Sequence, residues 1–405
     1  MLFKTSFWIR FSIFNLLLVA FLGLLMRYKI GFEFPLLDQK SLQHSHSHFA
    51  FAGWVSHTLM TLLISFLQKH DLKNNIAFKK YNSILIGNLI CSYVMLFSFI
   101  IQGYGAVSIT FSTLSIFASY WFAYVFFKDC KQIETKSTAV KWFKAAIFFN
   151  VISSLGTFAL AYMMATKNIH QNEYLASIYY YLHFQYNGWF FFACMGLLLD
   201  YLKVTTSSNR IYSQSFILLF WSCIAGYFLS TLWLDLPLWI YIITAISAVV
   251  QVIIWYLLFK TIIKENKSIF VNLSGYLKYL IIFISLALSV KFLLQLGSTI
   301  PAVSELAFGF RPIVIAYLHL ILLAIISLFL LFYVYANNFV VINKKTILGL
   351  ILFSLGVILN EVVLGIQGVA SLSYTLIPFI NESLFGIALL LFTSILWTTF
   401  YSKKR

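Results

Sequence analysis

The sequence predicts an all-α membrane protein whose chain crosses the bilayer many times. Hydrophobic residues make up 61% of the 405 residues and charged residues only 10%, whereas a soluble protein carries about a quarter of its residues as charges. Long apolar runs also recur along the whole chain, and each approaches the ~20 residues that a helix needs to cross a bilayer. These two observations exclude a soluble enzyme, a secreted disulfide-linked protein and a large extramembrane domain.

We predict twelve transmembrane helices, which together form a single integral membrane domain over residues 1–405. The first run is too long for the core of a signal peptide and lacks a small-residue cleavage motif, so we expect a retained first helix. Turn residues separate neighbouring helices at Gly103–Gly105 and at Leu234–Pro237. The predicted helices are 7–28, 46–68, 82–102, 106–127, 142–165, 174–201, 215–233, 237–260, 276–297, 312–336, 346–368 and 382–401.

The basic residues predict the orientation of these helices. Most Lys and Arg residues lie near the two termini and in the loops that follow the even-numbered helices, and short loops rich in Lys and Arg stay in the cytoplasm. Both termini are therefore predicted to be cytoplasmic, in the inner membrane of a bacterium. The net charge of +16 is then a topology signal and an attraction for anionic lipid heads, and no nucleic-acid partner is expected.

Titratable side chains inside the predicted helices are few, and each charge there costs at least about 2.5–3.5 kcal/mol. Histidines occur in the second, sixth and tenth helices, in the half of the membrane predicted to face outward: His46 and His48, His183, and His319. Imidazole is a common ligand to haem iron, copper and zinc. Three separate helices thus offer imidazoles at a similar depth for a haem or metal site.

Other polar residues of these helices have simpler interpretations. His57 lies deeper in the second helix and is expected to bond a neighbouring helix, whereas His44 is expected at a solvated outer mouth. Lys291 and Glu361 lie at a depth similar to that of the site histidines. Lys291 could extend its amine to the interface, and Glu361 could serve as its counter-ion or hydrate a cavity.

Short motifs around these histidines resemble the catalytic subunit I of the haem-copper oxidases and nitric-oxide reductases. Tyr181-Leu182-His183 followed by Asn187-Gly188-Trp189-Phe190 resembles the motif of the sixth helix in that family. Tyr317-Leu318-His319 resembles the paired histidines of the tenth helix, with the first histidine replaced by tyrosine. The twelve-helix plan with both termini inside is also similar, and it implies an oxidase subunit I-like bundle.

The resemblance implies specific ligands. His46 or His48 would hold a low-spin b-type haem together with His319, Tyr317 could ligate a haem through its phenolate, and His183 would be a ligand to copper or iron. The seventh predicted helix contains no histidine, so two of the three ligands of the second metal are missing. The chain is therefore expected to be a degenerate member of the superfamily that binds haem without an intact binuclear centre.

The expected function is a haem-binding membrane protein that transfers electrons, binds or senses nitric oxide or oxygen, or assists the assembly of an oxidase. Reduction of dioxygen to water is not expected, and an oxidoreductase activity stays open. Other respiratory-chain subunits or a cytochrome are the expected partners. The first alternative is a secondary transporter with an ion-coupled site at Lys291 and Glu361, and the second is a cofactor-free accessory subunit whose histidines only join helices.

Overall fold

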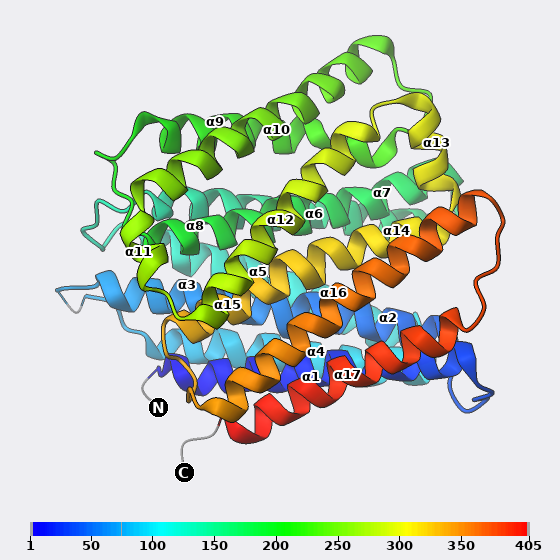
Figure 1. The fold of residues 1–405 in the computed structure, drawn as a ribbon, viewed down its shortest axis with the longest axis horizontal. Helices are drawn as coiled ribbons and strands as arrows, with labels where there is room; N and C mark the ends of the chain where they lie inside the picture. The colour runs from blue at the N-terminus through cyan, green and yellow to red at the C-terminus, as the bar shows by residue number, and fades with distance from the viewer. Residues whose placement is uncertain (1–2, 74, 403–405) are drawn as a thin grey trace. The chain divides into compact units, whose positions relative to one another are not determined.

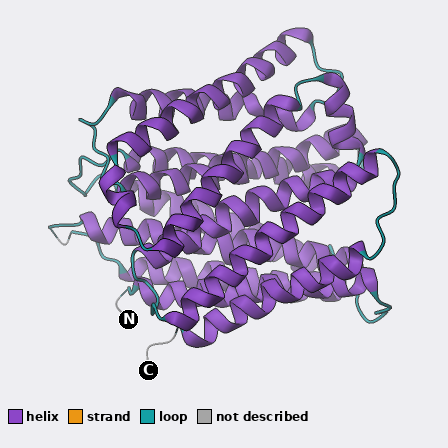
Figure 2. Cartoon of the chain, viewed as in Figure 1, coloured by secondary structure: helices purple, strands orange, loops and turns teal. Residues whose placement is uncertain are grey.

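The computed structural model of the protein describes residues 3–73 and 75–402 as helices joined by loops (Figure 2). Within these residues no β-strand is found, and eleven helices are long and apolar enough to cross a membrane. The prediction of a polytopic all-α membrane protein is therefore confirmed. The sixth predicted helix, 174–201, is also continuously helical from Gln171 to Tyr201, but its Tyr, Gln and Asn side chains lower its hydropathy, and it is not among the eleven.

The chain divides into two compact units, and each is described by itself. Unit 1 contains residues 1–135 and 327–405, so it is built from both ends of the chain. Its α-helices are labelled in Figure 1. Its elements are α1 (Thr5–Gly31), α2 (Gln39–Phe49), the π-helical η1 (Ala50–Ser56), α3 (His57–His70), α4 (Lys79–Gln102), α5 (Ala106–Asp129), α15 (Leu328–Ala336), α16 (Lys344–Leu372) and α17 (Ile380–Tyr401).

Unit 2 is the contiguous segment 136–326. Its boundary with unit 1 falls near the end of η4, inside one continuous helix over 311–336. Its elements are α6 (Ala139–Thr166), α7 (Gln171–His183), the π-helical η2 (Phe184–Phe190), α8 (Phe191–Tyr201), α9 (Arg210–Ala225), the 3₁₀-helical η3 (Gly226–Thr231), α10 (Leu238–Glu265), α11 (Lys267–Asn272), α12 (Gly275–Gly297), α13 (Pro301–Gly309), α14 (Arg311–His319) and the π-helical η4 (Leu320–Ser327).

The first and last helices of unit 1 pack antiparallel. Phe21 contacts Phe392 and Tyr28 contacts Phe385, both with ring centroids 5.7 Å apart. The start of α1 and the end of α17 therefore lie at the same end of unit 1, as Figure 1 shows.

Side-chain hydrogen bonds join distant helices inside unit 1. Asn15 Nδ2 of α1 donates to Gly53 O of η1 at 2.5 Å, and Tyr93 OH of α4 donates to Asn15 Oδ1 at 2.7 Å. Trp54 Nε1 donates to Ser327 Oγ at 2.9 Å. Because hydrocarbon offers no competing water, polar groups in a membrane need such internal partners.

Two predicted turns are confirmed, and one predicted helix start is too late. Gly103 ends α4 with a φ of 57°, a left-handed value that favours glycine, and Pro237 directly precedes α10. The second helix begins at Gln39 rather than at residue 46. Asp38 caps it by accepting a 2.7 Å hydrogen bond from the backbone N–H of Ser41, so this polar segment is helical.

Candidate functional site

The three π-helical segments directly follow the histidines singled out in the sequence. η1 begins two residues after His48, η2 begins directly after His183, and η4 begins directly after His319. No further π-helical segment occurs in residues 3–73 and 75–402. Since π-helical turns are rare and occur frequently at functional sites, their recurrence at three histidines marks these positions as candidates.

The ring of His46 in unit 1 is oriented by the backbone of α1. Its Nδ1 lies 3.1 Å from the carbonyl oxygen of Val19, so Nδ1 carries the proton and the lone pair resides on Nε2. Gly23 leaves room for the ring, because a Cβ atom at that position would lie 3.4 Å from Cε1 of His46. Histidines that bind metals commonly donate their other N–H to a carbonyl in this way.

His44 and His48 belong to an aromatic cluster instead. His48 Nε2 lies 3.2 Å from Tyr104 OH, and its ring stacks on Phe99 with centroids 4.4 Å apart. His44 contacts Tyr104 edge to face with centroids 4.6 Å apart. The Nε2 atom of His48 therefore already faces a hydroxyl group.

His57 is fully buried among neighbouring helices of unit 1. Its ring meets Trp8 of α1 with centroids 5.7 Å apart, and Asn88 Nδ2 of α4 lies 3.5 Å from its Nδ1. These contacts agree with the interhelical role expected for this histidine.

His183 in unit 2 uses both ring nitrogens in hydrogen bonds. Its Nε2 donates to the carbonyl oxygen of Cys223 in α9 at 2.8 Å, and its Nδ1 accepts from Asn187 Nδ2 in η2 at 3.1 Å. The only tautomer that satisfies both partners carries its proton on Nε2. A metal ion could bind this imidazole only after displacing one of the two partners.

A small cavity adjoins His183. Its volume of about 10 Å³ is near the lower limit for one water molecule, and its walls include Asn187, Gln251 and Lys291. Lys291 of α12 is only 4% exposed. Its Nζ lies 4.2 Å from the ring centroid of Phe292, a cation–π distance. Among the described residues no carboxylate forms a salt bridge with it.

His319 lies at the end of α14 in unit 2. Its Nδ1 is 2.8 Å from the carbonyl oxygen of Ile315, one turn earlier, so this imidazole also carries its proton on Nδ1 and its lone pair on Nε2. Tyr317 is partly buried two residues before it. Glu361 is partly buried on α16 of unit 1, where its carboxylate accepts a 3.2 Å hydrogen bond from Asn360.

The predicted site residues are therefore divided between the two units. His46, His48 and Glu361 lie in unit 1, and the remaining ones, Lys291, His183, Tyr317 and His319, lie in unit 2. Within unit 2, His183 and Lys291 line the same cavity. No group of three or more His, Cys, Asp or Glu side chains suited to a metal ion is found in the described part of the chain.

Sequence reasoning missed the partners of His183. Asn187 lies in the motif that begins at Tyr181 but had no predicted role, and neither Cys223 nor Gln251, which lines the adjoining cavity, was connected with the site. The available signal was the presence of amide side chains in apolar helices, where an unpaired polar group is costly.

In comparisons with known proteins, no family model and no curated protein matches the chain. The resemblance to the oxidase superfamily therefore depends on the motifs of this sequence alone.

Proposed function

We propose that the protein binds haem in the membrane, with His46 and His319 as ligands to the iron. The observation that carries the proposal is that the two rings carry their proton on the same nitrogen, Nδ1. His46 Nδ1 lies 3.1 Å from Val19 O, and His319 Nδ1 lies 2.8 Å from Ile315 O. Each imidazole therefore presents its lone pair on Nε2, which is the form that binds iron while the other N–H is held by a carbonyl.

The surroundings of His46 suit a ligand to haem iron. The carbonyl of Val19 fixes the tautomer and ring orientation of His46, while Gly23 keeps α1 from crowding the ring. A six-coordinate haem of this kind would supply one-electron transfer. His46 is favoured over His48 because the carbonyl of Val19 orients its ring through Nδ1, whereas the ring of His48 stacks on Phe99 within an aromatic cluster.

The two proposed ligands belong to different units. That both bind the same haem is what the resemblance to oxidase subunit I implies. Tyr317 stays a proposed ligand for a second haem. His183 is a poorer candidate for a metal ligand, because Cys223 O and Asn187 Nδ2 engage both its nitrogens. The further proposals are electron transfer, gas binding or assistance of oxidase assembly, with a cytochrome or respiratory subunits as partners.

The proposed topology completes this assignment. The segment 171–201 serves as a twelfth transmembrane helix, both termini are cytoplasmic, and the membrane is the inner membrane of a bacterium. The distribution of Lys and Arg supports this orientation.

The test is the absorption spectrum of the protein purified in detergent after expression with haem available. We expect a Soret band and, after reduction, the sharp visible bands of a six-coordinate low-spin haem. His319→Ala should abolish these bands because it removes a ligand, whereas His57→Ala should retain them. A colourless wild-type protein, or bands that persist in His319→Ala, would contradict the proposal.

A secondary transporter is the second candidate, and the burial of Lys291 favours it. Its amine lies against aromatic rings, and the residue lines a small cavity together with His183, Asn187 and Gln251, as expected of a membrane residue with a functional role. A colourless protein whose substrate uptake in vesicles is lost in Lys291→Met and Glu361→Gln would establish this function. A colourless protein without uptake would favour the remaining alternative, a cofactor-free accessory subunit.

A further inference from the structure

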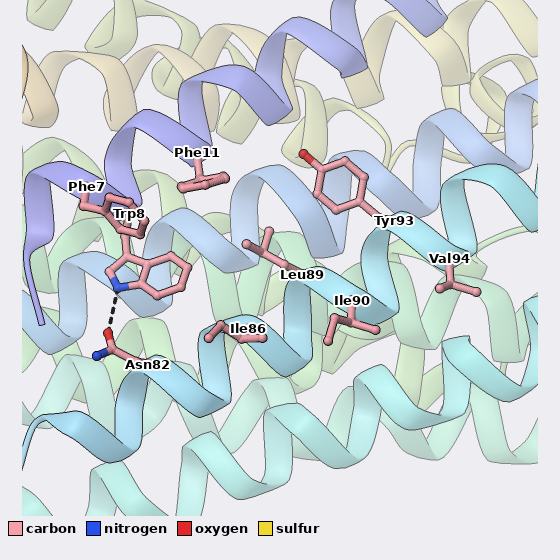
Figure 3. A pocket seen from close by; sticks show the side chains of 9 residues that line it. All are labelled: Phe7, Trp8, Phe11, Asn82, Ile86, Leu89, Ile90, Tyr93 and Val94. Atoms are coloured by element: carbon pink, nitrogen blue, oxygen red, sulfur yellow. Dashed lines mark hydrogen bonds between the residues drawn. The ribbon is translucent and has the colours of Figure 1, made fainter. Parts of the chain in front are cut away.

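We propose that a groove in unit 1 between α1 and α4 binds one acyl chain of an anionic glycerophospholipid. The groove has a volume of about 510 Å³, within the range of ~300–1,000 Å³ that is typical of ligand pockets. Figure 3 shows the side chains that line it, from Phe7 and Asn82 at one end to Tyr93 and Val94 at the other. This site is separate from the proposed haem ligands.

The wall of the groove is apolar because its polar side chains are paired with protein atoms. Trp8 Nε1 donates to Asn82 Oδ1 at 2.9 Å, as the dashed line in Figure 3 shows. Tyr93 OH donates to Asn15 Oδ1 at 2.7 Å. These bonds leave aromatic and aliphatic faces toward the groove, and such a surface suits a hydrocarbon chain better than a polar ligand.

The floor and the rim of the groove differ in exposure. Trp8 and Leu89 form a buried floor, 4% and 9% exposed. Phe11, Ile86 and Ile90 stand at the rim and are 39%, 48% and 53% exposed. The groove is therefore open along its length, so a lipid chain can enter it sideways from the bilayer.

The length of the groove fits one leaflet. Its α4 wall runs from Asn82 to Val94, roughly 18 Å at 1.5 Å per residue. One leaflet contributes about half of the ~30 Å hydrocarbon core. A single acyl chain lying along the groove would thus place its headgroup where α1 and α4 begin.

Two lysines stand at that end of the groove. Lys4 directly precedes α1, and Lys79 is the first residue of α4. They lie three residues before Phe7 and Asn82, and helical spacing places Lys79 on the groove side of α4. Both lysines are exposed, and neither has a carboxylate partner among the described residues. A phosphate-bearing headgroup complements this charge, so the occupant is an anionic phospholipid.

The experiment is native mass spectrometry of the full-length protein after removal of its lipids. Phosphatidylglycerol and phosphatidylcholine with identical acyl chains are added separately. We expect tighter retention of phosphatidylglycerol, and the double variant Lys4→Gln/Lys79→Gln should lose this preference by roughly fivefold for each lysine removed. The matched control Lys128→Gln/Lys131→Gln removes the same charge from two exposed positions, one in the last turn of α5 and one just after it, and should keep the preference.

A second variant tests the groove itself. Ile86→Trp fills the groove from its rim and should weaken retention of both lipids. Ile101→Trp, at an 82% exposed position of α4 outside the groove, should not. Helicity and monodisperse elution confirm that each variant is folded. Equal retention of the two lipids, variants that match their controls, or an isoprenoid quinone co-purifying in the groove would overturn the proposal.

Discussion

Two helices, α2 followed by η1 and α7 followed by η2, carry a histidine in the last turn before a π-helical segment, yet the two imidazoles differ in their surroundings. In the first, the carbonyl of Val19 lies against Nδ1 of His46 and fixes its tautomer. In the second, His183 meets an acceptor at Cys223 O and a donor at Asn187. The comparison teaches that a π-helical turn does not decide the role of the histidine before it. The groups that neighbouring segments present to the ring decide it.

The largest expected effect is on the haem absorption spectrum, which should differ between variants of these two histidines. His46→Ala should abolish the low-spin haem spectrum because it removes a proposed ligand, whereas His183→Ala should retain it because that ring is held by protein partners. Absorption spectra of the reduced, purified variants measure the difference.

His48→Ala is the internal control on α2 and should retain the bands. Loss of the pigment in His183→Ala together with its retention in His46→Ala would reverse the assignment.

A second prediction compares the glycines near the two histidines. A Cβ atom at Gly188 of η2 would lie 2.5 Å from Cβ of the buried Phe149, whereas one at Gly23 would lie 3.4 Å from His46 Cε1. Gly188→Ala should therefore lower the free energy of unfolding by about 1–3 kcal/mol through overpacking, and Gly23→Ala by less than about 1 kcal/mol. Thermal unfolding in detergent measures both. Equal losses would contradict this account of the packing around His46.

The smallest effect concerns how the two helices begin. Asp38 caps α2, and the hydrogen bond from the Ser41 N–H lowers the pKa of its carboxyl group. α7 begins at Gln171, and its N-cap residue, His170, makes no side-chain capping hydrogen bond. Because the folded pKa lies below the unfolded value of about 3.9, the contribution of Asp38 to stability is present above that value. It is lost as the pH falls through the folded pKa.

Melting curves measured between about pH 6 and about pH 3 test this cap. Asp38→Ala should lower the melting temperature at the upper end of this range, and its difference from the wild type should shrink toward the lower end. A difference that stays constant with pH would show that the carboxylate does not act as the cap.

Most helix positions could be predicted from the sequence, because hydrocarbon requires long apolar runs that end at polar residues. The predicted 276–297 and 312–336 lie within one residue of the observed helical segments Gly275–Gly297 and Arg311–Ala336. The start of α2 could not be predicted in this way. Its polar residues are stabilised in the helix by tertiary contacts, such as the 2.7 Å hydrogen bond from Ser45 Oγ to Leu96 O.

The candidate site could be predicted only as a set of positions. His46, His183 and His319 are visible in the sequence as rare titratable groups in apolar helices. Their ring orientations depend on other parts of the chain, as when the carbonyl of Val19 lies 27 residues before His46 and that of Cys223 lies 40 residues after His183. The π-helical segments also have no simple hydrophobic period that would reveal them.

The construction of unit 1 from both chain ends has a consequence for biosynthesis. The helices α1 to α5 leave the ribosome long before α15 to α17, which complete the same unit. The indole of Trp54 cannot reach its hydroxyl partner on Ser327 until some 270 further residues have been translated. Early insertion intermediates therefore expose polar groups to lipid before their partners have been translated. The contiguous segment 136–326, by contrast, can assemble from neighbouring helices as each one is released.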